Sequence, residues 1–202
     1  MKLSVIIPCY NEKNTLEEIV SRVLGADILG LAREVVIVDD CSRDNSLEIA
    51  KTLAADHPQV QVAAHDRNRG KSAALRTGFR QAQGDILLVQ DADLEYDPAD
   101  YAILLKPFVD GNADVVYGSR FQAPENTAFL GFTPRAGNKT LTFLSNLFSG
   151  LALTDVCTCY KVFSKSVLDR IELKEDRFGF CSEFTAKWAR MKPRPNFVEV
   201  PI

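Results

Sequence analysis

The chain has 202 residues, of which 46% are hydrophobic and 25% charged, and its formal net charge is −3. This length and composition are those of a globular protein with a sizeable core, most simply one domain. A net charge so close to zero gives no overall attraction to a polyanion, so we expect no nucleic-acid partner. The stretch at 141–153 is the nearest to a membrane span, but it is shorter than the roughly 18 residues required and contains polar residues.

Five cysteines are spread along the chain, and the apolar run at 1–8 is too short for a secretory signal. We therefore expect reduced thiols and a cytoplasmic location. Zinc binding by Cys157, Cys159 and Cys181 is a disfavoured alternative, because a C-x-C pair with one distant cysteine is not a usual zinc spacing.

Apolar runs rich in β-branched residues alternate with amphipathic segments over the first 120 residues. The runs predict strands at 2–10, 33–42, 60–66, 85–93 and 113–120. The segments between them predict helices at 14–26, 43–56, 70–84 and 97–111. Continuously apolar strands separated by helices indicate an open, mostly parallel, doubly wound α/β sheet with helices on both faces.

This alternation ends after residue 120. The pattern then predicts a loop at 121–134, an amphipathic helix at 135–155, a strand at 159–164, a helix at 178–192 and a strand at 196–202. No repeat or linker divides the chain. We therefore expect a single domain, 1–202, with a first half at 1–120 and a smaller second half at 121–202.

Polar residues stand at the carboxyl end of all five strands predicted in the first half. They are Cys9, Tyr10, Asn11, Glu12, Asp39, Asp40, His65, Asp66, Asp91, Asp93, Ser119 and Arg120. In open α/β sheets, ligands bind beyond these strand ends. We therefore expect the five strand ends to converge on one polar rim that holds the ligand.

The stretch LVQDADLEYD, at 88–97, has an acid at every second position. These acids are Asp91, Asp93, Glu95 and Asp97. In an extended chain they would share one side, where they repel one another unless a cation such as Mg²⁺ or Mn²⁺ compensates. The alternative is a solvated acidic loop, and for Asp97, which precedes a proline, we expect a helix cap.

Three further sites have two interpretations each. Asp39 and Asp40 either accept hydrogen bonds from a nucleotide or cap the next helix. Lys71 follows Gly70 at the start of a helix, where free N–H groups favour a phosphate, although no G-x-x-x-x-G-K loop is present. Arg120 either binds an anion or forms an ion pair at the edge of the core.

Seven blocks carry most of these residues, in the order SVIIPCYNE, VVIVDDCSRDNS, NRGKSAALRTGF, GDILLVQDADLEYDP, YGSRF, TDVCTCYKVF and FGFCSEFTAK. In this order, and over nearly the whole chain, they resemble the motifs of glycosyltransferase family 2. The similarity is greatest to its dolichol-phosphate mannosyltransferase-like branch of polyprenyl-phosphate glycosyltransferases. The D-x-D element alone is unspecific, whereas the ordered set is specific.

The resemblance implies a GT-A fold and a role for each matching residue. The residues that would line the base and ribose pocket are Pro8, Tyr10, Glu12, Asp39 and Asp40. Asp91, Ala92 and Asp93 would form the D-x-D element that binds the diphosphate and the metal, Mg²⁺ or Mn²⁺. Glu95 would complete the metal shell.

The resemblance also implies catalytic groups beyond the D-x-D carboxylate Asp93. Arg120 would face the diphosphate or the acceptor phosphate, and Asp155 and Glu183 match acidic positions on the acceptor side. A polyprenyl phosphate is ionised at neutral pH and needs no general base. A saccharide hydroxyl would need Asp155 or Glu183 in that role.

The expected activity is inverting, metal-dependent transfer of a hexose from a UDP- or GDP-sugar to a polyprenyl or dolichyl phosphate. The alternatives are transfer to a saccharide hydroxyl and a catalytically silent protein that binds nucleotide-sugars. The order of acids and lysine along the chain disfavours a receiver domain of a signalling system. The oligomeric state stays open.

The helix at 135–155 offers an apolar face for a lipid tail or the cytoplasmic face of a membrane. The face consists of Leu141, Phe143, Leu144, Leu147, Phe148 and Leu151, with Arg135 and Lys139 at one end. The alternative is that this face packs on the core.

Overall fold

The computed structural model describes residues 1–122, 132–177 and 179–202, with the backbone alone at 132–136. In this part of the chain, seven strands form one sheet in the order β3-β2-β1-β4-β6-β5-β7. The strands are β1 Lys2–Cys9, β2 Ala32–Asp39, β3 Val60–Ala64, β4 Ile86–Val89, β5 Val115–Ser119, β6 Lys161–Ser164 and β7 Phe197–Pro201. β6 runs antiparallel between β4 and β5, and the other pairings are parallel, which confirms the expected mostly parallel sheet.

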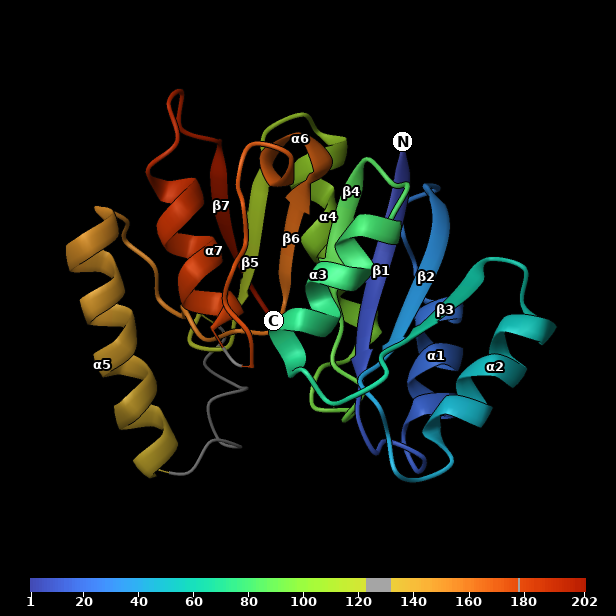
Figure 1. Cartoon of the computed structure of the whole chain (residues 1–202). Coiled ribbons are helices and arrows are strands. Elements are labelled where there is room, and N and C mark those ends of the chain that lie inside the picture. Colours follow the sequence, from blue (N-terminus) through green and yellow to red (C-terminus); the bar gives the residue numbers. More distant parts are fainter. Residues whose placement is uncertain (123–131, 178) are drawn as a thin grey trace.

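Helices cover both faces of this sheet (Figure 1). Those described are α1 Leu16–Gly25, α2 Ser46–Asp56, α3 Lys71–Gln81, the 3₁₀ turn η1 Pro98–Asp100, α4 Tyr101–Val109, α5 Phe132–Ser149, α6 Lys165–Leu168 and α7 Phe180–Ala189. Buried side chains of α1, α2 and α4 belong to one core cluster, and those of α3 and α7 to the other. α5 lies outside these layers, against α7.

The burial pattern explains why these segments fold as the sequence predicts. Residues 35–38 of β2 are all fully buried, because helices cover the sheet on both sides. The buried residues of α1 are Leu16, Ile19, Val20 and Val23. They recur at helical spacing, and Glu17 and Glu18 stand in the first turn, where the helix dipole favours negative charge.

The expected row of alternate acids is wrong, because β4 ends at Val89. Between Gln90 and Asp97 the chain bends, and Leu94 has a left-handed φ of 64°. The four acids therefore do not form one row along an extended chain. The expected cap is confirmed, since the carboxylate of Asp97 accepts the N–H of Ala99 at 3.0 Å.

The second half departs further from the sequence pattern. The pattern did not predict α6, which has four residues and is too short for a periodic signal. The helix expected at 135–155 begins at Phe132 and ends at Ser149, before Gly150, whose φ of 66° stops a helix. Most of the loop expected at 121–134 lies outside the described residues.

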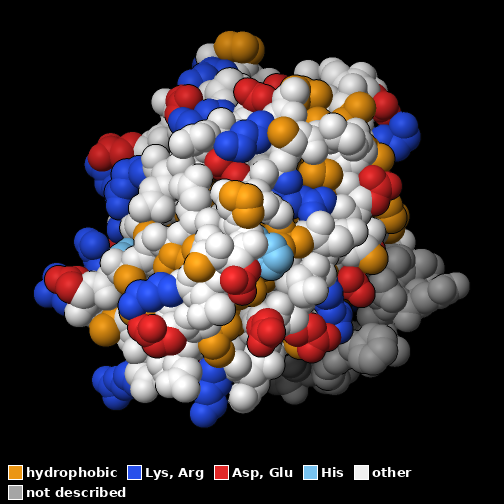
Figure 2. Space-filling view, turned by 90° about the vertical axis from the view of Figure 1, so that its right-hand side faces the viewer, with side chains coloured by type: hydrophobic (Ala, Val, Ile, Leu, Met, Phe, Trp, Pro, Cys, Tyr) orange, Lys and Arg blue, Asp and Glu red, His pale blue; other side chains and the backbone are white. Residues whose placement is uncertain are grey.

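α5 exposes a row of large apolar side chains. They are Leu141, Phe143, Leu144, Leu147 and Phe148. The alternative that this face packs on the core is therefore wrong for these five residues, whereas Leu151 is partly buried against the core. On the side of the molecule formed by α2 and β3, by contrast, charges of both signs are interspersed (Figure 2). Of the helices described, none combines the length and apolarity needed to cross a bilayer.

Candidate active site

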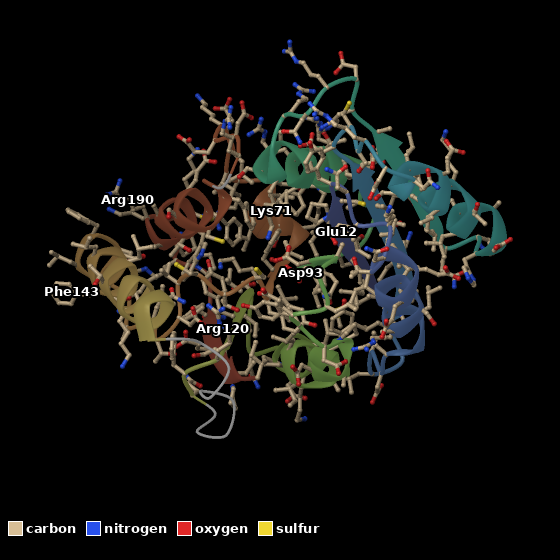
Figure 3. All side chains as sticks on the ribbon, turned by 90° about the horizontal axis from the view of Figure 1, so that it is seen from below. Glu12, Lys71, Asp93, Arg120, Phe143 and Arg190 are labelled. Atoms are coloured by element: carbon tan, nitrogen blue, oxygen red, sulfur yellow. The ribbon has the colours of Figure 1, made fainter. Side chains whose placement is uncertain are left out.

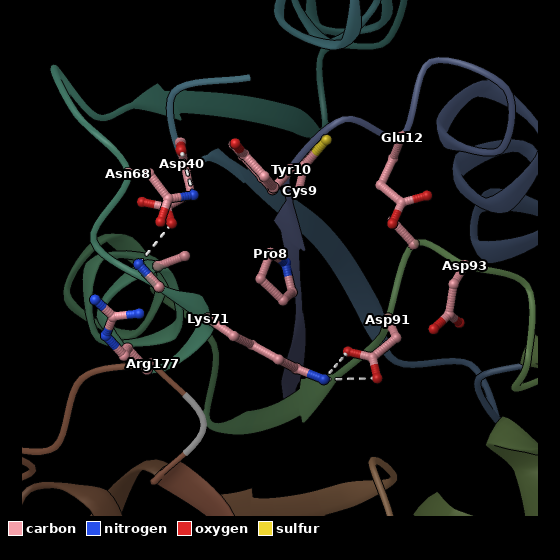
Figure 4. A pocket seen from close by; sticks show the side chains of 13 residues that line it. Pro8, Cys9, Tyr10, Glu12, Asp40, Asn68, Lys71, Asp91, Asp93 and Arg177 are labelled. Carbon is pink, nitrogen blue, oxygen red and sulfur yellow. Dashed lines mark hydrogen bonds and ion pairs between the residues drawn. The ribbon is translucent and has the colours of Figure 1, made fainter. Parts of the chain in front are cut away.

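A cavity of about 380 Å³ opens at the carboxyl ends of β1, β2 and β4, beside the first turn of α3 (Figure 4). Its lining comes from segments far apart in the sequence. The lining residues are Pro8, Cys9, Tyr10, Glu12, Asp40, Asn68, Gly70, Lys71, Ala74, Asp91, Ala92, Asp93 and Arg177. The expected convergence on one rim is therefore confirmed for these three strand ends.

A tight turn before α3 forms one wall of the cavity. Gly70 has a φ of 93°, and a Cβ at this position would lie 2.5 Å from Cα of Arg177, so only glycine fits. The carboxylate of Asp40 accepts the N–H groups of Arg69 at 2.9 Å and Gly70 at 2.7 Å. The same carboxylate lies 2.6 Å from Nδ1 of His65. Asp40 therefore holds the turn before α3 rather than capping the helix that follows β2.

Lys71 crosses the cavity to Asp91, as the dashed lines in Figure 4 show. Its Nζ lies 2.5 Å from Oδ1 and 2.7 Å from Oδ2 of Asp91, and 3.7 Å from Sγ of Cys159. Burial by itself would lower the pKa of Lys71, but the carboxylate of Asp91 raises it above its usual range. Lys71 is therefore positively charged in the cavity, and its ammonium group binds both carboxylate oxygens of Asp91.

Asp93 lines the cavity beside Asp91, but it is exposed, and its Oδ1 accepts the N–H of Glu95 at 3.0 Å. The side chain of Glu95 is also exposed and is not part of the cavity lining. Among the described residues, no group of three or more His, Cys, Asp or Glu side chains is arranged to hold a metal ion. The structure thus brings Asp91 and Asp93 together at the cavity and leaves Glu95 outside it.

Of the residues expected around the base and ribose, four line the cavity and one does not. Those that line the cavity are Pro8, Tyr10, Glu12 and Asp40. Oε2 of Glu12 accepts the hydroxyl of Thr15 at 2.7 Å. Asp39 is instead buried below the rim, where Oδ2 accepts the N–H of Ser42 at 3.0 Å and Oδ1 has no hydrogen-bond partner among the described residues.

Arg120, the last residue of the first half, forms an ion pair with Asp155 in the second half. Nε and Nη2 of Arg120 lie 2.8 and 3.0 Å from the two carboxylate oxygens of Asp155. Asp155 is fully buried, whereas 20% of the Arg120 side chain is exposed, on the α5 side of Asp93 (Figure 3). Burial would lower the pKa of Arg120, yet Asp155 raises it above its usual range. The structure therefore shows the expected ion pair of Arg120, and anion binding by Arg120 stays a prediction.

Glu183 lies outside the cavity, in the first turn of α7. Its carboxylate accepts the N–H groups of Lys174 at 2.7 Å and Glu175 at 2.9 Å, and it pairs with Lys187 at 2.6 Å. Burial would raise the pKa of Glu183, but these bonds lower it below its usual value. The structure therefore assigns Glu183 a part in holding the loop before α7, and the role of a general base stays a prediction without geometric support.

Arg177 and Asn68 also line the cavity and were not predicted from the sequence, whereas Cys9 lies at the rim as expected. Arg177 has a left-handed φ of 52°, and its carbonyl accepts both the N–H and the hydroxyl of Ser72, at 2.7 and 2.8 Å. These two residues are 105 positions apart, so no local pattern reveals their contact. Burial, with a further contribution from Asp39, raises the pKa of the Cys9 thiol to about 12, which makes it a poor nucleophile.

The sequence matches the family model described as glycosyl transferase family 2 over residues 4–172. The chain is 31% identical over 215 residues to UDP-N-acetylglucosamine–dolichyl-phosphate N-acetylglucosaminyltransferase of Methanococcus voltae, covering 98% of this chain and 83% of that protein. It is 42% identical over 121 residues to dolichol-phosphate mannosyltransferase of Pyrococcus furiosus, covering 60% of this chain and 34% of that protein.

A third relative is undecaprenyl-phosphate 4-deoxy-4-formamido-L-arabinose transferase of Pseudomonas syringae pv. syringae. The identity is 31% over 191 residues, or 93% of this chain and 55% of that protein. The chain thus spans most of one of these relatives and about a third to a half of the other two.

Solved structures share the fold at lower identity. Mannosyltransferase PcManGT from Pyrobaculum calidifontis, in complex with GDP-Man and Mn²⁺, matches 98% of this chain and 54% of its own, with a TM-score of 0.68 and 22% identity. Glucosyl-3-phosphoglycerate synthase from Mycobacterium tuberculosis, in complex with UDP, matches 99% and 69%, with a TM-score of 0.76 and 18% identity. The expected GT-A type of fold is confirmed.

Proposed function

Because the chain belongs to glycosyl transferase family 2 and is therefore a glycosyltransferase, we propose that it transfers a hexose from a UDP- or GDP-sugar to a polyprenyl phosphate, with inversion at the anomeric carbon. The names of the three curated relatives, each a dolichyl- or undecaprenyl-phosphate glycosyltransferase, support this acceptor class. The observation that carries the donor half of the proposal is the pairing of Lys71 with Asp91 across a cavity at the strand ends.

The cavity offers groups of both signs, as a nucleoside diphosphate with a cation requires. Glu12, Asp91 and Asp93 lie at one side of it and Arg177 at the other, and the side chain of Lys71 reaches across to Asp91 (Figure 4). The polar rim near Tyr10 and Asp40 is where the base and ribose would bind. A base and ribose bound there would bring the diphosphate within reach of Lys71.

The carboxylates of Asp91 and Asp93 suit a hard divalent cation, Mg²⁺ or Mn²⁺. Such a cation is commonly held by one or two carboxylates together with the phosphates of a substrate, so Glu95 is not required. When bound, it supplies positive charge that stabilises the leaving diphosphate.

Lys71 has two partners in this proposal, one before and one after the donor binds. In the empty cavity its ammonium group neutralises Asp91. An incoming diphosphate offers the ammonium group an alternative anion, and the transfer of Lys71 to a phosphate oxygen frees Asp91. The positive charge of Lys71 then lies beside the oxygen on which negative charge develops as the hexose leaves.

The acceptor half of the proposal depends on Arg120 and α5. A polyprenyl phosphate needs a cation for its phosphate and an apolar surface for its tail, but no general base. Arg120 has exposed surface on the α5 side of the cavity, and α5 presents the apolar face, with Lys139 exposed beside it. We place this face against the lipid and the cytoplasmic surface of a membrane.

The burial of Asp155 weighs against the alternative acceptor, a saccharide hydroxyl. That reaction needs a base, yet Asp155 is fully buried with both oxygens on Arg120. The other candidate base, Glu183, lies outside the cavity and is bound by Lys187.

The test is a transfer assay with radiolabelled UDP- and GDP-hexoses, Mn²⁺ and either a short polyprenyl phosphate in detergent or soluble saccharides. The proposal predicts label in the organic phase, as a glycosyl phosphate that mass spectrometry identifies. Transfer to saccharides alone would overturn the acceptor. Binding of a nucleotide without any transfer would identify a silent binding protein.

A further inference from the structure

Gln90, the residue before Asp91, has a fully buried side chain at the end of β4. Its Nε2 donates to the carbonyl of Asp91 at 3.0 Å and to the carbonyl of Tyr96 at 3.2 Å. These two carbonyls mark the ends of the loop that carries Asp93. One amide group therefore closes the loop into a ring.

The other end of the same amide binds two phenols from separate elements. Oε1 accepts the hydroxyl of Tyr101, on α4, at 2.7 Å and the hydroxyl of Tyr160, just before β6, at 3.0 Å. Both N–H donors and both acceptor positions of Gln90 are thus used. The orientation of the amide is fixed, because the reverse orientation would place Oε1 against two carbonyl oxygens.

The loop between Asp91 and Tyr96, which this amide holds, has a strained backbone that other contacts must stabilise. Leu94 has a left-handed φ of 64°, a conformation that costs energy for a residue other than glycine. Within the loop, the carboxylate of Asp93 accepts the N–H of Glu95. The carbonyls at the two ends are fixed by Gln90, and the place of Asp93 beside Asp91 follows from that.

The same network reaches the second half of the molecule. The hydroxyl of Tyr96 accepts the N–H of Cys159 at 3.2 Å, and the rings of Tyr96 and Tyr160 lie 4.8 Å apart. Sγ of Cys159 lies 3.7 Å from Nζ of Lys71, and the guanidinium of Arg120 lies 5.7 Å from the centre of the Tyr96 ring. Groups of both halves therefore meet at the loop that Gln90 closes.

We propose that Gln90 is the positioning residue of this site: its amide sets the shape of the Asp91–Tyr96 loop, so that Asp91 and Asp93 face a divalent cation and a nucleoside diphosphate together. This inference rests on the proposed function, because it assigns a supporting role to that site. Gln90 itself touches neither ligand. Its effect passes through two backbone carbonyls.

The test compares Gln90→Met with Tyr101→Phe by calorimetric titration of UDP and GDP, each with and without MnCl₂. Gln90→Met keeps the length of the side chain and removes both bonds to the loop, whereas Tyr101→Phe removes a bond to the same amide and leaves the loop bonds intact. We expect the Mn²⁺-dependent gain in nucleotide affinity to fall about 10- to 100-fold in Gln90→Met. We expect Tyr101→Phe to retain it within about 2-fold, although both variants lose stability.

Equal gains in wild type and folded Gln90→Met would overturn the inference, as would an equal loss in Tyr101→Phe. Should Gln90→Met not fold, Gln90→Glu decides. It keeps an acceptor oxygen for the two phenols and replaces the Nε2 donor that binds the two loop carbonyls, so we expect a loss in the same direction, and an undiminished gain would overturn the inference. A wild type without Mn²⁺-dependent nucleotide binding would instead refute the proposed function.

Discussion

The two halves of the molecule prepare their sites in opposite ways. In the first half, the polar groups of the cavity are engaged with one another, Lys71 with Asp91 and Asp40 with the turn at Gly70. In the second half, Asp155 is paired with Arg120, the last residue of the first half, while the apolar side chains of α5 stay exposed. Under the proposed function, a donor would have to exchange ion pairs that already exist, whereas an acceptor would gain by covering apolar surface.

The largest effect is expected when the buried ion pair between Arg120 and Asp155 is removed. Asp155→Asn leaves the guanidinium of Arg120 largely buried without its counter-ion. We expect the free energy of unfolding to fall by about 3–5 kcal/mol, as measured by chemical denaturation. The control is Asp110→Asn in the exposed pair with Lys106, where we expect a loss of no more than about 0.5 kcal/mol. Similar losses in the two variants would show that the buried pair contributes no more to stability than an exposed pair.

A substitution in the cavity of the first half should reduce activity rather than stability. Asp93→Ala removes an exposed carboxylate of the cavity, so we expect transfer to fall by about 10²- to 10³-fold with little change in melting temperature. The matched control is Asp97→Asn, four positions further along the loop, where the amide oxygen still caps the next turn. A full retention of activity in Asp93→Ala, measured with polyprenyl phosphate, would remove the carboxylate from the mechanism.

If Lys71 exchanges its ion pair with Asp91 for one with the diphosphate, its removal should change the affinities for the metal and for the nucleotide in opposite directions. Lys71→Met removes the cation that competes for Asp91, so Mn²⁺ alone should bind more tightly, while UDP or GDP should bind about 10-fold more weakly because a charged hydrogen bond is lost. Calorimetry measures both affinities separately. If the variant binds the metal and the nucleotide equally less well, Lys71 supports the cavity without competing for Asp91.

The open apolar face of the second half should affect membrane binding alone. Phe143 is 67% exposed on α5, and Phe143→Ser should reduce binding to anionic vesicles up to about 10-fold without affecting nucleotide binding. Ile103, 46% exposed on α4, provides the control Ile103→Ser. Equal reductions in a flotation assay would show that α5 has no preferred contact with lipid.

Much of this architecture could be predicted from periodicity and strand-end chemistry. The alternating apolar runs indicated the parallel strands, and the polar residues after β1, β2 and β4 indicated the cavity. The bend after Val89 could not be predicted, because the acids at 91–97 fit an extended chain equally well and only the buried amide of Gln90 shows what closes the loop. Arg177 reaches the cavity through a contact with Ser72, which sequence spacing cannot show.

The most direct test of the central claim, that the cavity binds a nucleoside diphosphate through a cation held by Asp91 and Asp93, is a thermal-shift series with UDP, GDP, CDP and ADP, each with and without Mn²⁺. We expect that one of UDP or GDP raises the melting temperature of the wild type only when Mn²⁺ is present, and that Asp93→Ala abolishes the shift. Equal stabilisation without the metal, or an undiminished shift in Asp93→Ala, would contradict it.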